Sequence, residues 1–329
     1  TFKTTDVLSS DNYNIVLSRP TNSSINVNTL MDLNGEIYIE YGTSSGNYTG
    51  QTGSVAIASG TPVNRLISGL SSDTRYYYRL VFLEEGTGTW LPGEEYSFHT
   101  QRATDETFTF SITSDSHLGQ TFSSNSPDRY EQATLNIASE MPDFHLDLGD
   151  AFIISTDLGV GTYQTGTQEQ VNTVYEGQRP YFGNFSHSTP VFVVIGNHEN
   201  EEGWNLDDTP FSRALASIKA RKQYFPNPVP DGFYSGNSDL LSAIGGDQLR
   251  EDYYAFEWGD ALFVILDPFQ YTLTKPYGTI TGSGEDNDET TTGDQWDWTL
   301  GAQQYEWFRN TLENSSAKLL DLLYRQQID

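Results

Sequence analysis

Residues 108–117 read FTFSITSDSH, residues 144–150 read FHLDLGD and residues 191–199 read VFVVIGNHE. Each stretch starts as an apolar run rich in aromatic or β-branched side chains, which predicts a β-strand, and ends in polar side chains. If the three strands run parallel in one sheet, their carboxyl ends meet at one edge, where open α/β folds place their ligand sites. The sequence therefore predicts an α/β sheet with a site at that edge.

The first two polar ends carry side chains that suit a metal ion. Asp115 and His117 are two residues apart, so both can face the same way if the end of the strand stays extended. Gly149 permits a sharp turn that aims Asp150 over the sheet edge, and the two oxygens of this carboxylate can bridge two cations.

The third stretch supplies Asn197, an amide oxygen ligand, and His198, whose ring can stay free to donate a proton or to stabilise charge. The chain contains no cysteine, and ligands that mix nitrogen with oxygen suit Zn, Mn or Fe. We therefore expect one or two metal ions of this kind as cofactors.

Helices are predicted between and after the strands. Ser126-Pro127 is typical of a helix start, and Tyr130 and Ile137 follow at helical spacing. Residues 301–314 predict a further helix, with one face made of Tyr305, Phe308 and Leu312.

This order of motifs resembles the calcineurin-like metallophosphoesterase superfamily, whose pattern runs Asp-x-His, Gly-Asp and Gly-Asn-His-(Glu or Asp), followed by Gly-His and Gly-His-x-His. The resemblance implies that Asp115, His117 and Asp150 hold one ion. It also implies that Asp150 bridges to a second ion held partly by Asn197, and that His198 assists phosphoryl transfer. In such sites two cations, about 3.5 to 4 Å apart, clamp the phosphate and activate a water.

The first part of the chain has a different pattern. Residues 1–104 are rich in Thr, Ser, Asn, Gly and Tyr, with short alternating runs separated by turns, which predicts an all-β sandwich. Residues 70–76 resemble the fibronectin type III turn in which a tyrosine hydroxyl fixes the corner. Such a module ahead of a metallophosphoesterase domain, here 105–329, resembles the arrangement of secreted purple acid phosphatases. Residues 101–105 would be a short polar linker.

The pattern departs from the purple enzymes in three places. They carry a tyrosine three residues after the bridging aspartate, where this chain has Ile153, and usually glycine at the position of His117. We therefore expect a colourless relative with Zn, Mn or Fe(II). The resemblance covers about residues 105–318, and no histidine follows His198, so we expect the domain to be incomplete at its C-terminus.

Several polar residues have an ordinary structural interpretation. His99, His145 and His187 are expected to be satisfied structural histidines, His145 inside a buried strand. Asp147 is expected to accept hydrogen bonds at the end of a strand. Glu199 is expected to orient His198 or a neighbouring backbone amide.

The composition limits the partners. Among 329 residues, 17 are basic and 45 acidic, and the net charge of −28 argues against nucleic acids and anionic membranes as partners. No stretch reaches the length of a membrane span. Asn-x-Ser/Thr sequons are compatible with a secreted or periplasmic glycoprotein, at Asn22, Asn47, Asn184 and Asn314.

The leading hypothesis for function is metal-dependent hydrolysis of small phosphoric esters outside the cytoplasm. An inactive or impaired extracellular surface or matrix protein that keeps the fold is the alternative. A carbohydrate-adhesion protein is a third hypothesis, based on the sandwich and its tyrosines.

Overall fold

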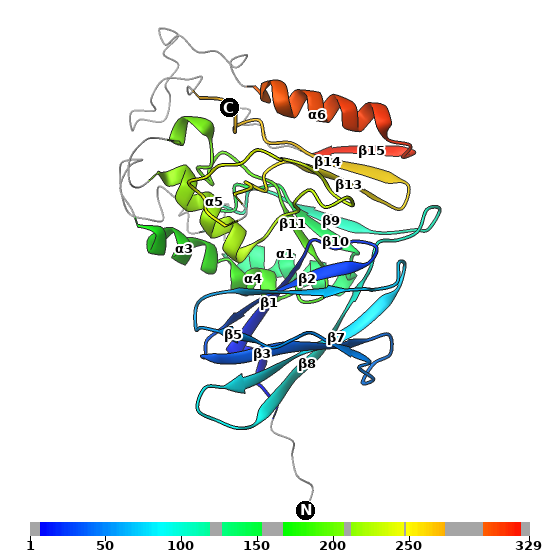
Figure 1. Ribbon diagram of the computed structural model, residues 1–329, viewed down its shortest axis with the longest axis vertical. Coiled ribbons are helices and arrows are strands. Elements are labelled where there is room, and N and C mark those ends of the chain that lie inside the picture. Colours follow the sequence, from blue (N-terminus) through cyan, green and yellow to red (C-terminus); the bar gives the residue numbers. More distant parts are fainter. Residues whose placement is uncertain are drawn as a thin grey trace, which may run out of the picture.

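The computed structural model describes residues 7–118, 127–152, 167–206, 212–246, 248–273 and 299–323, with the backbone alone at 321–323. The chain folds into a β-sandwich, blue to cyan in Figure 1, and an α/β part stacked upon it. No helix among these described residues is long and apolar enough to cross a membrane.

The sandwich consists of two antiparallel sheets. One sheet has the order β1-β2-β6 and the other β4-β3-β7-β8, with β5 paired to β3. The strands are β1 Tyr13–Ser18, β2 Ser24–Met31, β3 Gly35–Gly42, β4 Gly50–Gln51, β5 Val55–Ile57, β6 Val63–Ser68, β7 Arg75–Glu84 and β8 Trp90–His99. The backbone N–H of Ser71 donates to the Tyr76 hydroxyl at 2.9 Å, so the predicted tyrosine corner is confirmed. This part is a fibronectin type III-like sandwich.

A parallel sheet carries the three motifs. Its strands are β9 Phe110–Thr113, β10 Phe144–Asp147 and β11 Val191–Val193, in the order β11-β10-β9, and both pairings are parallel. The predicted alignment of the three apolar runs is therefore confirmed. A second sheet has the order β12-β13-β14-β15, from strands β12 Ser235–Gly236, β13 Tyr254–Trp258, β14 Ala261–Ile265 and β15 Leu319–Leu323.

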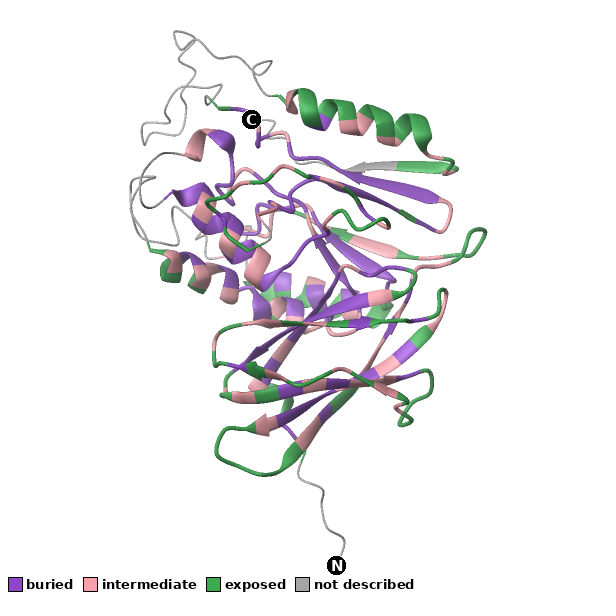
Figure 2. Ribbon diagram, in the orientation of Figure 1, coloured by how far each residue is buried: buried purple, intermediate pink, exposed green. Residues whose placement is uncertain are grey.

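The two sheets of the α/β part pack face to face, with helices outside. Buried aromatic side chains join them, among them Phe144 and Phe192 of the parallel sheet and Phe256 and Phe263 of the second. Figure 2 shows this interior as a continuous buried zone. Helices on the sandwich side are α1 Pro127–Glu140, α3 Gln168–Glu176, α4 Arg179–Gly183 and α5 Arg213–Tyr224. Short 3₁₀ turns lie before β1, at Ser10–Asn12, and after β11, at Gly203–Asn205.

Helix α6, Gly301–Asn314, has the predicted bounds but a different buried face. Tyr305 is 54% exposed and Leu312 36% exposed, whereas Gln304 is fully buried. Gln304 is buried because its side chain is paired with the backbone of Asp267. Its Nε2 atom donates to the Asp267 carbonyl at 2.7 Å, and its Oε1 atom accepts from the Asp267 backbone N–H at 2.9 Å. Trp307 and Phe308, on the same face as Gln304, then pack against β13 and β14.

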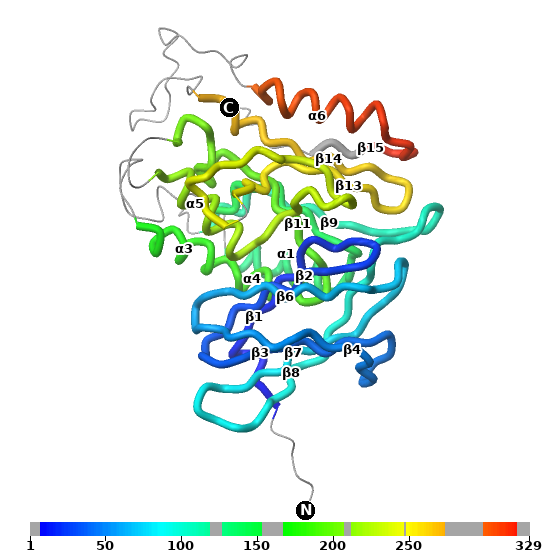
Figure 3. The backbone as a smooth tube through the Cα atoms, viewed as in Figure 1, coloured from blue at the N-terminus to red at the C-terminus, as the bar shows by residue number. Residues whose placement is uncertain are grey.

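The sandwich and the α/β part are joined by buried polar contacts. Helix α4 lies against strand β1 of the sandwich, at the level where the two parts meet in Figure 3. The Ser186 hydroxyl donates to the Ile15 carbonyl at 2.7 Å, and the Tyr78 hydroxyl donates to the His187 carbonyl at 2.6 Å. The contact between the two parts thus extends well beyond the polar segment 101–105.

Candidate metal centre

The loops after β9 and β10 continue side by side beyond the ends of the strands. The backbone N–H of Asp115 donates to the Gly149 carbonyl at 3.0 Å, and the backbone N–H of His117 donates to the Asp150 carbonyl at 3.1 Å. These contacts bring the first two motifs to the same edge of the sheet, as the sequence predicts.

The backbone at the predicted ligands departs from the expected extended form. Asp115, His117 and Asp150 have φ values of 60°, 45° and 52°, in the left-handed region that side chains other than glycine rarely adopt. Such a conformation costs on the order of 1–3 kcal/mol per residue and clusters at functional sites. The condition of an extended strand end at 115–117 is therefore not met, although the two side chains still converge, with His117 Nε2 3.5 Å from Asp115 Oδ1.

Three ligand atoms meet over the sheet edge. The Oδ2 atom of Asp150 lies 3.9 Å from His117 Nε2 and 4.0 Å from His198 Nε2. One ligand atom from each of the three residues lies within 4.8 Å of those of the other two, and the two rings meet nearly edge-on, with centroids 5.1 Å apart. Ligands on one Zn-sized ion are separated by roughly 3 to 4 Å, so an ion held at Asp150 Oδ2 and His117 Nε2 would also lie close to the His198 ring.

The side chains of the cluster differ in their exposure to solvent. The Asp150 side chain is 1% exposed, while those of His117 and His198 are 17% and 30% exposed. Asp115 is 38% exposed. A ligand can therefore approach over the histidines, with Asp150 beneath it.

The structure thus brings together Asp115, His117, Asp150 and His198. His198, predicted as a proton donor rather than a ligand, lies as near to the Asp150 carboxylate as His117 does. Asn197 is half-buried on the same loop, and its role as a ligand remains a prediction. Ile153 lies outside the described residues.

The Glu199 carboxylate lies beside Asp150 and is held by backbone amides. Glu199 is 2% exposed, and its carboxylate accepts from the amides of Gly196 at 2.8 Å, Asp150 at 3.1 Å and Ala151 at 3.0 Å. Burial, and then the nearby Asp150 carboxylate, raise the pKa of Glu199. The expectation that Glu199 contacts a neighbouring backbone amide is confirmed.

A buried polar chain lies beneath the site, between β9 and β10. His145 Nδ1 is 2.8 Å from Ser111 Oγ, and its Nε2 is 3.0 Å from Thr113 Oγ1. Asp147 accepts from the Gly149 amide at 2.9 Å, which confirms its role at the strand end. Burial lowers the pKa of His145 to about 3 and raises the pKa of Asp147 to about 7.

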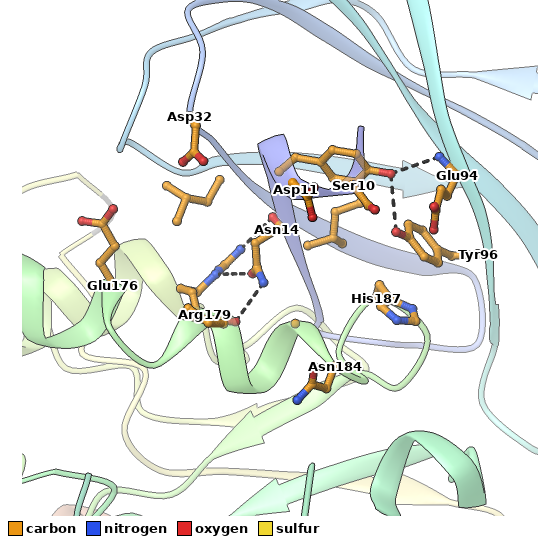
Figure 4. A pocket seen from close by; sticks show the side chains of 15 residues that line it. Ser10, Asp11, Asn14, Asp32, Glu94, Tyr96, Glu176, Arg179, Asn184 and His187 are labelled. Atoms are coloured by element: carbon orange, nitrogen blue, oxygen red, sulfur yellow. Dashed lines mark hydrogen bonds between the residues drawn. The ribbon is translucent and has the colours of Figure 1, made fainter. Parts of the chain in front are cut away.

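A separate cavity of about 620 Å³ lies between the sandwich and α4 (Figure 4). Tyr96 and His187 stack there, with ring centroids 4.2 Å apart, and Arg179 lies across from them. None of the five predicted site residues is among the described residues that line this cavity. It is therefore distinct from the cluster over the sheet edge.

Comparisons with solved structures identify the fold. No known family profile matches this chain, and no curated protein matches it in sequence. The structure of PhoD matches 94% of the chain with a TM-score of 0.64 and 17% identity. The purple acid phosphatase PPD1 from yellow lupin (Lupinus luteus) seeds also matches 94%, with a TM-score of 0.57 and 14% identity.

The chain therefore has a metallophosphoesterase fold of the purple acid phosphatase kind, as its motifs predict. It spans 61% of the length of the PhoD chain and 50% of that of PPD1.

Proposed function

We propose that this chain hydrolyses phosphoric esters of small molecules with the help of one or two bound Zn, Mn or Fe ions. The observation that carries the proposal is the convergence of His117 Nε2 and His198 Nε2 on Asp150 Oδ2, at 3.9 and 4.0 Å, at the carboxyl edge of a parallel sheet. The likeness in fold to PhoD and to a purple acid phosphatase supports it.

Five residues make up the proposed site. Asp115, His117 and Asp150 hold the first ion, and Asp150 and Asn197 contribute to a second. Because three side chains serve the first ion and two the second, the first is held more tightly. Bound ions would supply charge stabilisation to the phosphoryl group and a lowered pKa to the attacking water.

His198 acts in this proposal as the catalytic general acid. When water attacks phosphorus and the bond to the ester oxygen breaks, the departing oxygen needs a proton, which a protonated His198 ring donates. The backbone N–H of His198 donates to Asp150 Oδ1 at 3.1 Å, which fixes the residue beside the cluster. Its 30% exposure lets the ring recover a proton from solvent.

The surroundings of the site complete the proposal. We place the sandwich at 1–104 and the catalytic domain at 105–329, in a secreted or periplasmic protein. Glycans are proposed at the exposed Asn22, Asn47 and Asn314 and at the half-buried Asn184. Since the net charge of −28 repels phosphate esters, substrate binding would depend on the local charge of the ions.

A second candidate is an extracellular surface or matrix protein that keeps the fold without activity. It is favoured by the two-residue ligand set of the second ion, Asp150 and Asn197. The presence of all five predicted site residues favours the enzyme, because an inert scaffold has no physical need for all of them.

Hydrolysis of chromogenic aryl phosphate mono- and diesters separates the two candidates. The chain is assayed with Mn²⁺ or Zn²⁺, with a chelator, and as the Asp150→Asn variant. Turnover that requires the metal and Asp150 supports the proposal. A metal-loaded chain that hydrolyses neither ester leaves the second candidate.

A further inference from the structure

Glu199 and Asp150 bind each other's loops through backbone amides. The Oε2 atom of Glu199 accepts from the Gly196 and Asp150 amides, and Oε1 accepts from the Ala151 amide. In return, Asp150 Oδ1 accepts from the His198 amide at 3.1 Å. The loops after β10 and β11 are thereby closed into a ring of four hydrogen bonds.

This ring determines how the Asp150 carboxylate is turned. Because Oδ1 faces the His198 amide, Oδ2 is the oxygen that faces His117 Nε2 and His198 Nε2, at 3.9 and 4.0 Å. Both Asp150 and Glu199 are at most 2% exposed, so water does not compete for these contacts. The orientation of the central ligand thus depends on its partners in the ring.

The close fit around Gly196 points to the same role. A Cβ atom at Gly196 would lie 2.1 Å from Asp150 Oδ1 and 2.7 Å from Glu199 Oε2, so only glycine lets the two carboxylates approach this loop. Asp150 also has a φ of 52°, a strained conformation that needs support from its surroundings. The amide contacts of Glu199 at Asp150 and Ala151 provide that support.

We propose that Glu199 is a positioning residue, which orients Asp150 and the 196–198 loop for metal binding without touching the metal or the substrate. This inference rests on the proposed function. Residues that orient a metal ligand typically contribute 10- to 100-fold to metal affinity. Glu199→Gln keeps the size of the side chain but puts an NH₂ group where one carboxylate oxygen accepts a backbone N–H. We therefore expect it to weaken Mn²⁺ binding about 10- to 100-fold.

Glu201→Gln is the matched control. Glu201 is also buried and is two residues along the chain, but its carboxylate accepts from the Arg221 guanidinium at 2.7 and 2.9 Å. This variant should destabilise the fold and leave the Mn²⁺ dissociation constant within about twofold, since no amide of the 149–151 turn contacts it.

Two measurements test the proposal. Titration of the metal-free chains with Mn²⁺ alone gives the dissociation constants. Hydrogen exchange of the metal-free chains measures how well the backbone amides of Gly196, Asp150 and Ala151 are protected. These amides should exchange at least about tenfold faster in Glu199→Gln than in the wild type. If Glu199→Gln does not fold, Glu199→Asp takes its place, because it keeps the charge but is too short to reach all three amides.

The outcomes are distinct. Weaker Mn²⁺ binding and faster exchange in Glu199→Gln, with an unchanged constant in Glu201→Gln, support the proposal. A folded Glu199→Gln that binds Mn²⁺ as the wild type does, or an equal loss in Glu201→Gln, overturns it. If the wild-type chain binds no Mn²⁺, the proposed function fails, and exchange alone decides whether Glu199 holds the two loops.

Discussion

Arg179 of helix α4 places its Nε atom 2.7 Å from Asn14 Oδ1 in strand β1 of the sandwich. Its four other guanidinium N–H groups donate to the side chain of Asn28 and to the backbone carbonyls of Asn14, Asn28 and Tyr224. All five donors are thus used, each by a neutral acceptor, and the side chain is 1% exposed. Burial lowers the pKa of Arg179 to about 9, so it remains charged at pH 7.

The first prediction concerns this contact between the two parts. Arg179→Met removes five hydrogen bonds and leaves the carboxamide oxygens of the half-buried Asn14 and the buried Asn28 without these donors. We expect the free energy of unfolding in urea to fall by about 3 kcal/mol or more.

Arg79→Met is the control for the first prediction. Arg79 pairs with Glu40 on the solvent side of the sandwich and is 32% exposed, so the loss should be at most about 1 kcal/mol. Equal losses in the two variants would show that the Arg179 contact contributes no more than a surface ion pair.

The sequence predicted those features that depend on local patterns. The three motif strands and the turn at Gly149-Asp150 follow from apolar runs and from glycine, and the structure places them in one parallel sheet. The tyrosine corner follows from a short stretch around Tyr76. The convergence of His117 with Asp150 was expected for the same reason, because parallel strands end at one edge.

Features that depend on contacts between distant residues were not predicted. The acceptors of Arg179 come from both the sandwich and α5, more than 100 residues apart in the chain, and no local pattern reveals them. Phe308 of the predicted face of α6 packs against the sheet, but Tyr305 and Leu312 are exposed. The reason is that the polar Gln304 is buried through its hydrogen bonds with Asp267. The approach of His198 Nε2 to Asp150 Oδ2, at 4.0 Å, joins residues 48 positions apart in the chain, and no local pattern indicates it.

The second prediction concerns metal content. Asp150→Asn weakens a ligand shared by both proposed ions, so retention of Mn²⁺ or Zn²⁺ after dialysis should fall from about one equivalent to nearly none. Elemental analysis gives the stoichiometry.

Asp147→Asn is the control for the second prediction, because it keeps an oxygen for the Gly149 amide. This variant should retain the metal. Loss of metal in Asp147→Asn but not in Asp150→Asn would mean that Asp147 is the ligand.

The third prediction separates two roles for His198. As a general acid it should contribute about 100-fold or more to kcat, so His198→Ala should lower kcat by that factor with nearly unchanged metal content. The comparison requires a wild-type chain that hydrolyses an aryl phosphate. A loss of metal affinity as large as the loss of rate would instead make His198 a ligand, as its 4.0 Å approach to Asp150 also permits.

The fourth prediction concerns pH and the buried pair beneath the site. The pKa of His145 is about 3 in the folded chain against 6.5 for the free side chain. Between these values the unfolded chain binds a proton that the folded chain does not bind. The contribution of His145 to stability is therefore complete above pH 6.5 and is lost as the pH falls toward 3. The contribution of Asp147 to stability changes with pH in the opposite direction. Folding raises its pKa from 3.8 to about 7, so between these values the folded chain keeps a proton that the unfolded chain loses.

Between pH 4 and 6.5 the two contributions therefore oppose each other in the wild-type chain. His145→Gln removes the contribution of His145. The free energy of unfolding of this variant, minus that of the wild type, should therefore increase as the pH falls from 6.5 to 4. The increase is at most on the order of 1.4 kcal/mol per pH unit. Asp147→Asn should show the reverse trend. Urea unfolding at several pH values measures both, and profiles parallel to that of the wild type would mean that neither group titrates differently on folding.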